Sequence, residues 1–257
     1  MAKEDWWKPE NLKSSEKTFL ENDNITDLDT GNDFGSYKVM RMTGDLENSQ
    51  INSHNDLTPR YRVSSMRSLL GGKVYSKILD IGCGLGYTTS EIVDVFDGAN
   101  VIGIDISEDA ILYAKKHFKN CEFRCEAINP NEMEQHFDFE LITAFEFYPF
   151  TRTSSLKDHI SYIEHLTKDM RLGGSLVILQ LWDNPNSLSV NYEVLRTHFS
   201  HLDFKAYEIP IRKIATFFHY RRLAVFMSIF LRPILRVITK RKIGRDKMIV
   251  ITKNAIS

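Results

Sequence analysis

The chain has 257 residues, 42% of them hydrophobic and 26% charged, with a formal net charge of −1 at pH 7. These values are typical of a globular protein with one large domain, or one domain with extensions, in which a sizeable core can be buried. The longest uncharged apolar run, 223–231, has nine residues, whereas a membrane-spanning helix needs about 20, so we expect no membrane span.

The first part of the chain is polar. Residues 1–56 contain scattered Asn, Asp, Ser and Gly, and we expect an irregular extension there. The start, MAKEDWWKPE, is charged and lacks the apolar core of a secretory signal, so we expect a cytoplasmic protein. The stretch RYRVSSMRSLLGG predicts a helix that ends at two glycines. We therefore divide the chain into 1–73, an N-terminal extension with a lid helix, and a main domain at 74–257.

Strands and helices alternate in the main domain. The predicted strands are 74–81, 100–106, 122–128, 138–145, 175–182, 204–211 and 248–253. The predicted helices are 87–96, a segment capped by Ser107, a short helix near 130–136, 155–171 and 187–199. Such alternation indicates a parallel sheet covered on both faces, whose ligand binds beyond the carboxyl ends of the strands. His159 and His165 are expected on the solvent side of the helix at 155–171, and we discount them as catalytic residues.

The stretch ILDIGCGLG at 78–86 ends a strand in Asp80 and continues with three alternating glycines. Glycine lets another group approach the backbone closely. The dinucleotide fingerprint is G-x-G-x-x-G, without an acid before it. A carboxylate repels a pyrophosphate and attracts an ammonium group. The pattern therefore favours a cationic ligand with an amino-acid end over NAD.

LDIGCGLG resembles the first motif of the class I S-adenosylmethionine-dependent methyltransferases, of the type that acts on small molecules. VIGIDISEDAILYAKKHF, at 101–118, looks like their second segment. The resemblance covers 74–254. It implies the cofactor S-adenosyl-L-methionine and a Rossmann-like, seven-stranded mixed α/β sheet whose last strand is antiparallel, between the fifth and sixth. The domain 74–257 would then bind the cofactor and carry a basic, apolar helical insertion at 212–246.

The resemblance also implies cofactor contacts. The methionine part would lie at Asp80 and the loop formed by Gly82, Cys83, Gly84 and Gly86. Asp105 would accept hydrogen bonds from both ribose hydroxyls, which suits an ionised carboxylate.

The adenine side of the resemblance is less regular. Ile106 would pack on the adenine, and Phe145, at the end of the strand that faces the transferred methyl group, would also contact the cofactor. The third motif departs from the family pattern, because the expected acid falls on Ala127 and Glu126 comes one residue early. Three interpretations remain open: Glu126 binds the adenine, the amides of Ala127 and Ile128 do so, or Glu126 is a solvated strand end.

The methyl donor is an electrophilic sulfonium, so the protein must hold an acceptor in line and, for a hydroxyl, remove its proton. The catalytic candidates are Glu146, Tyr148 and His54, and Glu146 is the favoured group. Each has a plainer interpretation: a carboxylate bonded to backbone or a helix end, a packed ring and an exposed histidine. The other residues expected to line the acceptor space are Tyr61, Arg62, Trp182 and Asp183. Asp183 and Asn184 are similar to part of the magnesium site of some small-molecule O-methyltransferases. The second acid of that site is missing here, so we predict no metal.

We expect O- or N-methylation of a small polar acceptor such as a sugar, an envelope glycan precursor or a secondary metabolite. AFEFYPF has a weak similarity to the SEVLYY-like stretch of sugar and chito-oligosaccharide methyltransferases. A nucleic-acid (RNA) methyltransferase ranks below this, because FEFY replaces the [DN]-P-P-[YF] of base-methylating enzymes. A non-catalytic, cofactor-binding interaction protein is the third alternative.

Two further features concern cysteine and charge. Cys121 and Cys125 fall in one predicted strand, about 13 Å apart, too far for a disulfide. With Cys83 they are interpreted as small buried residues of a reduced protein. Residues 211–257 hold twelve Lys and Arg against one acid, a charge of +11, which leaves −12 for the rest. The insertion at 212–246 either caps the substrate pocket or forms a homodimer contact, or it attaches to an anionic membrane surface at the inner face.

Overall fold

The computed structural model describes residues 58–130, 137–181, 184–210, 223, 226–231, 233–234 and 246–254. The expectations for 1–56, for most of the short helix near 130–136, and for His54, Trp182 and Asp183 lie outside the described residues. The division at residue 73 and the extent of the insertion at 212–246 stay predictions.

The core is a seven-stranded sheet with the order β3-β2-β1-β4-β5-β7-β6. The strands are β1 Lys77–Ile81, β2 Asn100–Asp105, β3 Glu122–Cys125, β4 Leu141–Phe145, β5 Ser175–Leu181, β6 Leu202–Glu208 and β7 Asp246–Lys253. Strands β1 to β5 pair in parallel, whereas β7 pairs antiparallel with both β5 and β6. The predicted mixed sheet, with its last strand inserted antiparallel beside the fifth, is confirmed.

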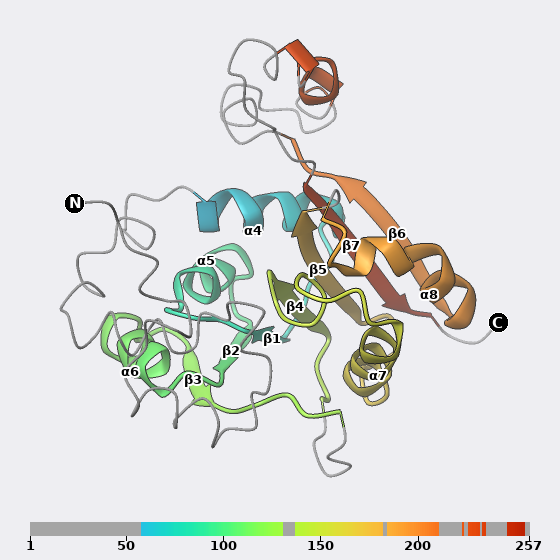
Figure 1. The fold of residues 1–257 in the computed structure, drawn as a ribbon. Coiled ribbons are helices and arrows are strands. Elements are labelled where there is room, and N and C mark those ends of the chain that lie inside the picture. The colour runs from blue at the N-terminus through green and yellow to red at the C-terminus, as the bar shows by residue number, and fades with distance from the viewer. Residues whose placement is uncertain are drawn as a thin grey trace, which may run out of the picture.

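The described helices lie on both faces of the sheet (Figure 1). They are α4 Thr58–Leu69, α5 Tyr87–Val95, α6 Glu108–His117, α7 Leu156–Thr167 and α8 Tyr192–His198. Further helical residues are described at 223, 226–231 and 233–234. Ser107 caps α6 as predicted, since its hydroxyl accepts the Ala110 N–H at 3.3 Å. The helix predicted at 187–199 instead begins with a 3₁₀ turn, Leu188–Asn191, before α8.

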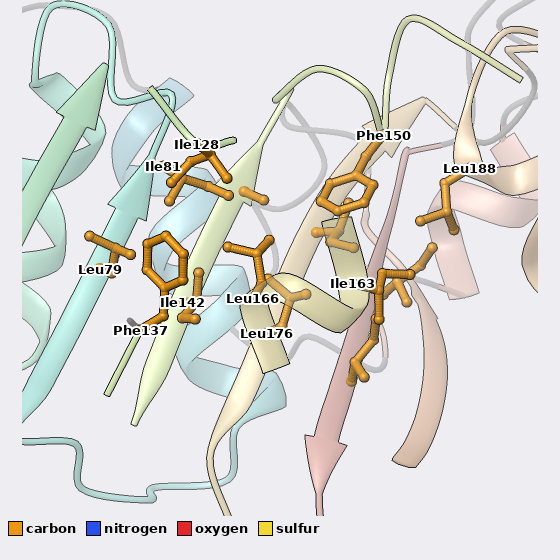
Figure 2. Close-up of a cluster of buried hydrophobic side chains, with 14 of the residues drawn as sticks. Leu79, Ile81, Ile128, Phe137, Ile142, Phe150, Ile163, Leu166, Leu176 and Leu188 are labelled. Atoms are coloured by element: carbon orange, nitrogen blue, oxygen red, sulfur yellow. The ribbon is translucent and has the colours of Figure 1, made fainter. Parts of the chain in front are cut away.

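Two apolar layers hold the helices to the sheet. On one face α4 and α5 contribute Val63, Met66 and Ile92, each fully buried against the strands. On the other face, Figure 2 shows Ile163 and Leu166 of α7 directed at the strands that carry Ile142 and Leu176. Full burial of such a side chain stabilises the fold by about 1.5–3 kcal/mol. The sheet is therefore a rigid platform whose strand ends fix the site.

The expectation that His159 and His165 lie on a helix surface is wrong, because they are 0% and 4% exposed. His159 Nδ1 lies 3.0 Å from the Asn191 amide nitrogen, and its Nε2 lies 3.2 Å from the Pro149 carbonyl oxygen. An amide that donates to Nδ1 leaves Nε2–H to donate to the carbonyl, which is the neutral tautomer. Burial lowers the pKa of His159 accordingly. His159 therefore joins α7 to the loop after β4 and serves to hold the fold together.

The cysteines also differ from expectation. Cys83 is buried as predicted, but Cys121 is half-buried and Cys125 is exposed, because β3 ends at Cys125 near the edge of the sheet. All three are free thiols.

Within the part of the chain that the structure describes, no helix combines the length and apolarity needed to cross a membrane.

Candidate functional site

The glycine loop leaves β1 at the carboxyl edge of the sheet and leads into α5. Gly82, Gly84 and Gly86 have φ angles of 68°, 53° and 83°, a region that glycine adopts without the steric cost of a Cβ. The amides of Gly82 and Cys83 donate to the Ile104 carbonyl at 2.8 and 3.0 Å. The Gly84 amide donates to Asp105 Oδ2 at 2.8 Å. The loop is thus folded onto the end of β2.

Gly86 serves packing as well as conformation. A Cβ placed there would lie 2.8 Å from Phe123 Cζ and 2.9 Å from Ala114 Cβ. We expect Gly86→Ala to lower the free energy of unfolding by about 2–4 kcal/mol, since overpacking adds to left-handed strain. Gly98→Ala is the matched control: its φ is 77°, but nothing lies within 4 Å of its Cβ. Equal losses in urea denaturation would contradict the packing role of Phe123 and Ala114.

Asp80 lies beneath the loop, 2% exposed. Its carboxylate accepts the Thr89 hydroxyl at 2.7 Å and the Thr143 hydroxyl at 2.6 Å. These bonds tie β1 to α5 and β4. Desolvation raises the pKa of Asp80 to about 6, against the two hydroxyl bonds, and the nearby Asp105 adds to the rise. The side chain therefore braces the loop from inside, and its direct contact with a ligand stays a prediction.

The raised pKa of Asp80 gives a pH prediction. Its folded pKa of about 6 exceeds the ordinary 3.8, so its contribution to stability is complete below the ordinary value and is lost as pH rises through the folded value. The free energy of unfolding of the wild type, minus that of Asp80→Asn, should fall on the order of 3 kcal/mol across this window. Denaturation of both proteins across this range measures it. A flat difference would contradict a buried, titrating Asp80.

Asp105 ends β2 beside the loop and is 6% exposed. Its Oδ1 accepts the Ser107 amide at 2.9 Å, while Oδ2 accepts the Gly84 amide. A carboxylate offers about four lone-pair positions, so a side chain of this type can bond to backbone amides and to ligand hydroxyls together. Ile106 follows, half-buried, and Glu126 lies next to it because its amide donates to the Asp105 carbonyl at 3.0 Å. Ala127 is exposed beyond the end of β3. These four residues meet at one edge.

The opposite side of the loop is formed by residues after β4. Glu146 has a φ of 58°, and its exposed carboxylate forms an ion pair with Arg62 of α4. Tyr61, also on α4, donates its hydroxyl to the Pro210 carbonyl after β6. Helix α4 therefore reaches from the end of β4 to the segment after β6, and its role as a lid stays a prediction. Tyr148 is half-buried next to this pair in sequence.

Three residues at the site, one phenylalanine and two threonines, were not identified from the sequence. Phe147 covers Gly82 so closely that a Cβ there would lie 2.9 Å from its ring. Thr89 and Thr143 hold Asp80. Phe147 could have been found, since it follows Glu146 directly in FEFYPF. Phe145, in contrast, is 8% exposed and packs in the core with Val177 and Leu179.

The glycine loop brings backbone that carries no Cβ next to the carboxylate of Asp105, and these groups suit the amino-acid end and the ribose hydroxyls of S-adenosylmethionine. The described residues hold no group of three His, Cys, Asp or Glu side chains that could bind a metal ion.

The sheet order, with β7 antiparallel next to β5, and the glycine loop beside Asp105 define the Rossmann-like fold of class I methyltransferases. Residues 73–213 match the family described as Methyltransferase domain, which is more than half of the chain. The chain belongs to this methyltransferase family, and the resemblance inferred from LDIGCGLG is confirmed.

Curated relatives match over shorter stretches. A malonyl-[acyl-carrier protein] O-methyltransferase of Acetivibrio thermocellus is 38% identical over 77 residues, 29% of this chain and 27% of that protein. A ubiquinone biosynthesis O-methyltransferase of Acinetobacter baylyi is 25% identical over 144 residues, 52% of this chain and 58% of that protein. The chain spans less than two thirds of the length of these relatives.

Solved structures share the fold. The plantazolicin methyltransferase BpumL, in complex with a pentazolic analog and S-adenosylhomocysteine, has a TM-score of 0.57 at 17% identity, covering 95% of this chain and 100% of that one. The N-methyltransferase NodS of Bradyrhizobium japonicum WM9, with S-adenosyl-L-homocysteine, has a TM-score of 0.54 at 14% identity, covering 85% and 98%.

Proposed function

We propose that this protein is an S-adenosylmethionine-dependent methyltransferase that acts on a small polar acceptor. One observation carries the proposal: the glycine loop after β1 is bonded to Asp105 at the end of β2, through the Gly84 amide. This edge offers backbone for close approach and a carboxylate for vicinal hydroxyls. Membership of the methyltransferase family supports the same cofactor.

The proposed cofactor contacts follow the edge of the sheet. Gly82, Cys83 and Gly84 face the amino-acid end, with the charge of Asp80 beneath them. Asp105 accepts the ribose hydroxyls. Ile106, Glu126 and Ala127 surround the adenine, since they lie together at the ends of β2 and β3. When bound, S-adenosylmethionine supplies an electrophilic methyl group on a sulfonium.

Glu146 is the proposed group that orients the acceptor and takes its proton. It lies directly after β4, the strand next to β1, in a left-handed conformation. Its side chain is 60% exposed and reaches Arg62 of α4. Arg62 holds the carboxylate in place through the ion pair. Tyr148 is a second proposed contact for the acceptor. His54 is a third proposed catalytic residue, on the evidence of the sequence alone.

The acceptor class is a small polar molecule, with a sugar, an envelope glycan precursor or a secondary metabolite proposed first. The named relatives include O-methyltransferases and the fold neighbours an N-methyltransferase, so either oxygen or nitrogen suits the proposal. The charged Arg62–Glu146 pair lies on the proposed acceptor side of the glycine loop. A charged pair in a ligand site favours polar groups on the acceptor.

Release of S-adenosylhomocysteine from S-adenosylmethionine tests the proposal, with nucleotide sugars as the acceptor panel and homopolymeric RNA as the competing class. We expect turnover with at least one nucleotide sugar and none with RNA. Turnover with RNA alone would overturn the acceptor class. Cofactor binding without turnover on either panel would favour a non-catalytic protein and contradict the proposed function.

A further inference from the structure

Residues 223–234 present large apolar side chains to solvent. Leu223, Phe226, Phe230 and Ile234 are 44%, 64%, 62% and 44% exposed. All four are helical and lie three or four residues apart, so they share one side of a helix. Ser228, in the same stretch, is 1% exposed. A helix in water normally turns its polar residues outward. This helix does the reverse, so its exposed side is suited to an apolar environment.

The sequence on both sides of these residues is strongly basic, although 223–234 itself holds a single basic residue, Arg232. Residues 211–257 carry twelve Lys and Arg and one acid, which gives +11 beside −12 for the remainder. A helix with aromatic and aliphatic residues on one side and cationic residues around it is typical of binding at the interface of an anionic membrane. The phosphates of a nucleic acid would also bind these cationic residues, but exposed aliphatic residues such as Leu223 and Ile234 cannot stack on bases. Charge and apolar exposure together favour lipid.

The position of the segment relates it to the candidate site. β6 runs antiparallel to β7, and β7 runs antiparallel to β5. β6 therefore ends at the same edge of the sheet as β1 and its glycine loop. Figure 1 shows the helical residues of 223–234, in orange-red, beyond the ends of β6 and β7 and apart from the layers of the domain.

We propose that residues 223–234 bind the surface of an anionic lipid bilayer. Phe226 and Phe230 insert at the boundary between headgroups and acyl chains, and the neighbouring Lys and Arg residues contact lipid phosphates. Binding of this kind holds the glycine-loop edge of the sheet near the membrane surface. The proposal concerns attachment and does not depend on methyl transfer.

Sedimentation of the full chain with vesicles tests this, using phosphatidylcholine mixed with phosphatidylglycerol and phosphatidylcholine alone. We expect the wild type to pellet with the anionic vesicles only, and less so at high salt. Phe226→Ser with Phe230→Ser should reduce partitioning at least about tenfold. Arg221→Gln should reduce it about fivefold. The matched control is Val190→Ser with Val194→Ser, two side chains that are each 52% exposed elsewhere, which should leave partitioning unchanged.

Four results would overturn the proposal. The first is a wild type that stays in the supernatant, and the second is equal binding to neutral vesicles. The third is an equal loss in the Val190 and Val194 control. The fourth is a wild-type dimer in sedimentation velocity that the two Phe substitutions convert to monomer, without vesicle binding, which would assign the face to a second copy of this chain. Thermal unfolding of each variant verifies that it is folded.

Discussion

Asp105→Ala should weaken the binding of S-adenosylhomocysteine about a hundredfold or more. The substitution removes the proposed acceptor of two ribose hydroxyls, and hydrogen bonds to a charged group contribute about 1.5–3 kcal/mol each. It also removes the partner of the Gly84 and Ser107 amides, which fixes the loop against β2. Isothermal titration calorimetry measures the loss.

Two further variants separate the ligand contact from the loop contact. Asp105→Asn keeps the size of the side chain, but its amide NH₂ must face either the Gly84 or the Ser107 amide, and both donate. We expect an intermediate loss of affinity. Asp138→Ala removes a carboxylate that pairs with Arg171 and Lys77 at the opposite edge of the sheet, and it should bind the ligand as the wild type does. Unchanged affinity in Asp105→Ala would remove the assignment to the ribose.

Glu146→Ala should lower turnover about a hundredfold, the effect expected when a general base is removed. The measurement is the release of S-adenosylhomocysteine with the nucleotide sugar that gives the highest wild-type rate. Affinity for S-adenosylhomocysteine should stay unchanged, since Glu146 lies on the acceptor side of the loop in this proposal. Arg62→Ala keeps the carboxylate but frees it from the ion pair, so we expect a smaller loss of turnover.

The matched control for Glu146 is Glu193→Ala, another exposed glutamate that pairs with an arginine, Arg196. It should retain full turnover. Equal turnover in Glu146→Ala and the wild type would dismiss Glu146 as a catalytic residue. A parallel loss of cofactor affinity in Glu146→Ala would assign it to the cofactor side instead.

Local signals predicted most of the fold. Apolar runs set the strands, and Ser107 marked the start of α6 as a cap. The spacing of residues in α7 also indicates that His159 is buried. His159, Ile163 and Leu166 lie three or four residues apart and so share one side of the helix, and this side is the buried one. The 3₁₀ turn before α8 was missed, because Ser187 and Ser189 bond to the Asn184 carbonyl rather than continuing a helix.

The site was less accessible to sequence reasoning because its contacts are distant along the chain. The bonds of Asp80 to Thr143, and of Arg62 to Glu146, join residues more than sixty positions apart. A negative charge before a glycine loop was visible in the sequence. Its burial under the loop was not, since that depends on which hydroxyls the sheet brings to it.

The most direct test of the account is calorimetric titration of the wild-type chain with S-adenosylhomocysteine and, separately, with NAD. We predict one saturable site for S-adenosylhomocysteine, weakened about a hundredfold or more by Asp105→Ala, and no heat of binding for NAD. Saturable binding of NAD together with silence toward S-adenosylhomocysteine would contradict the assignment of the glycine loop.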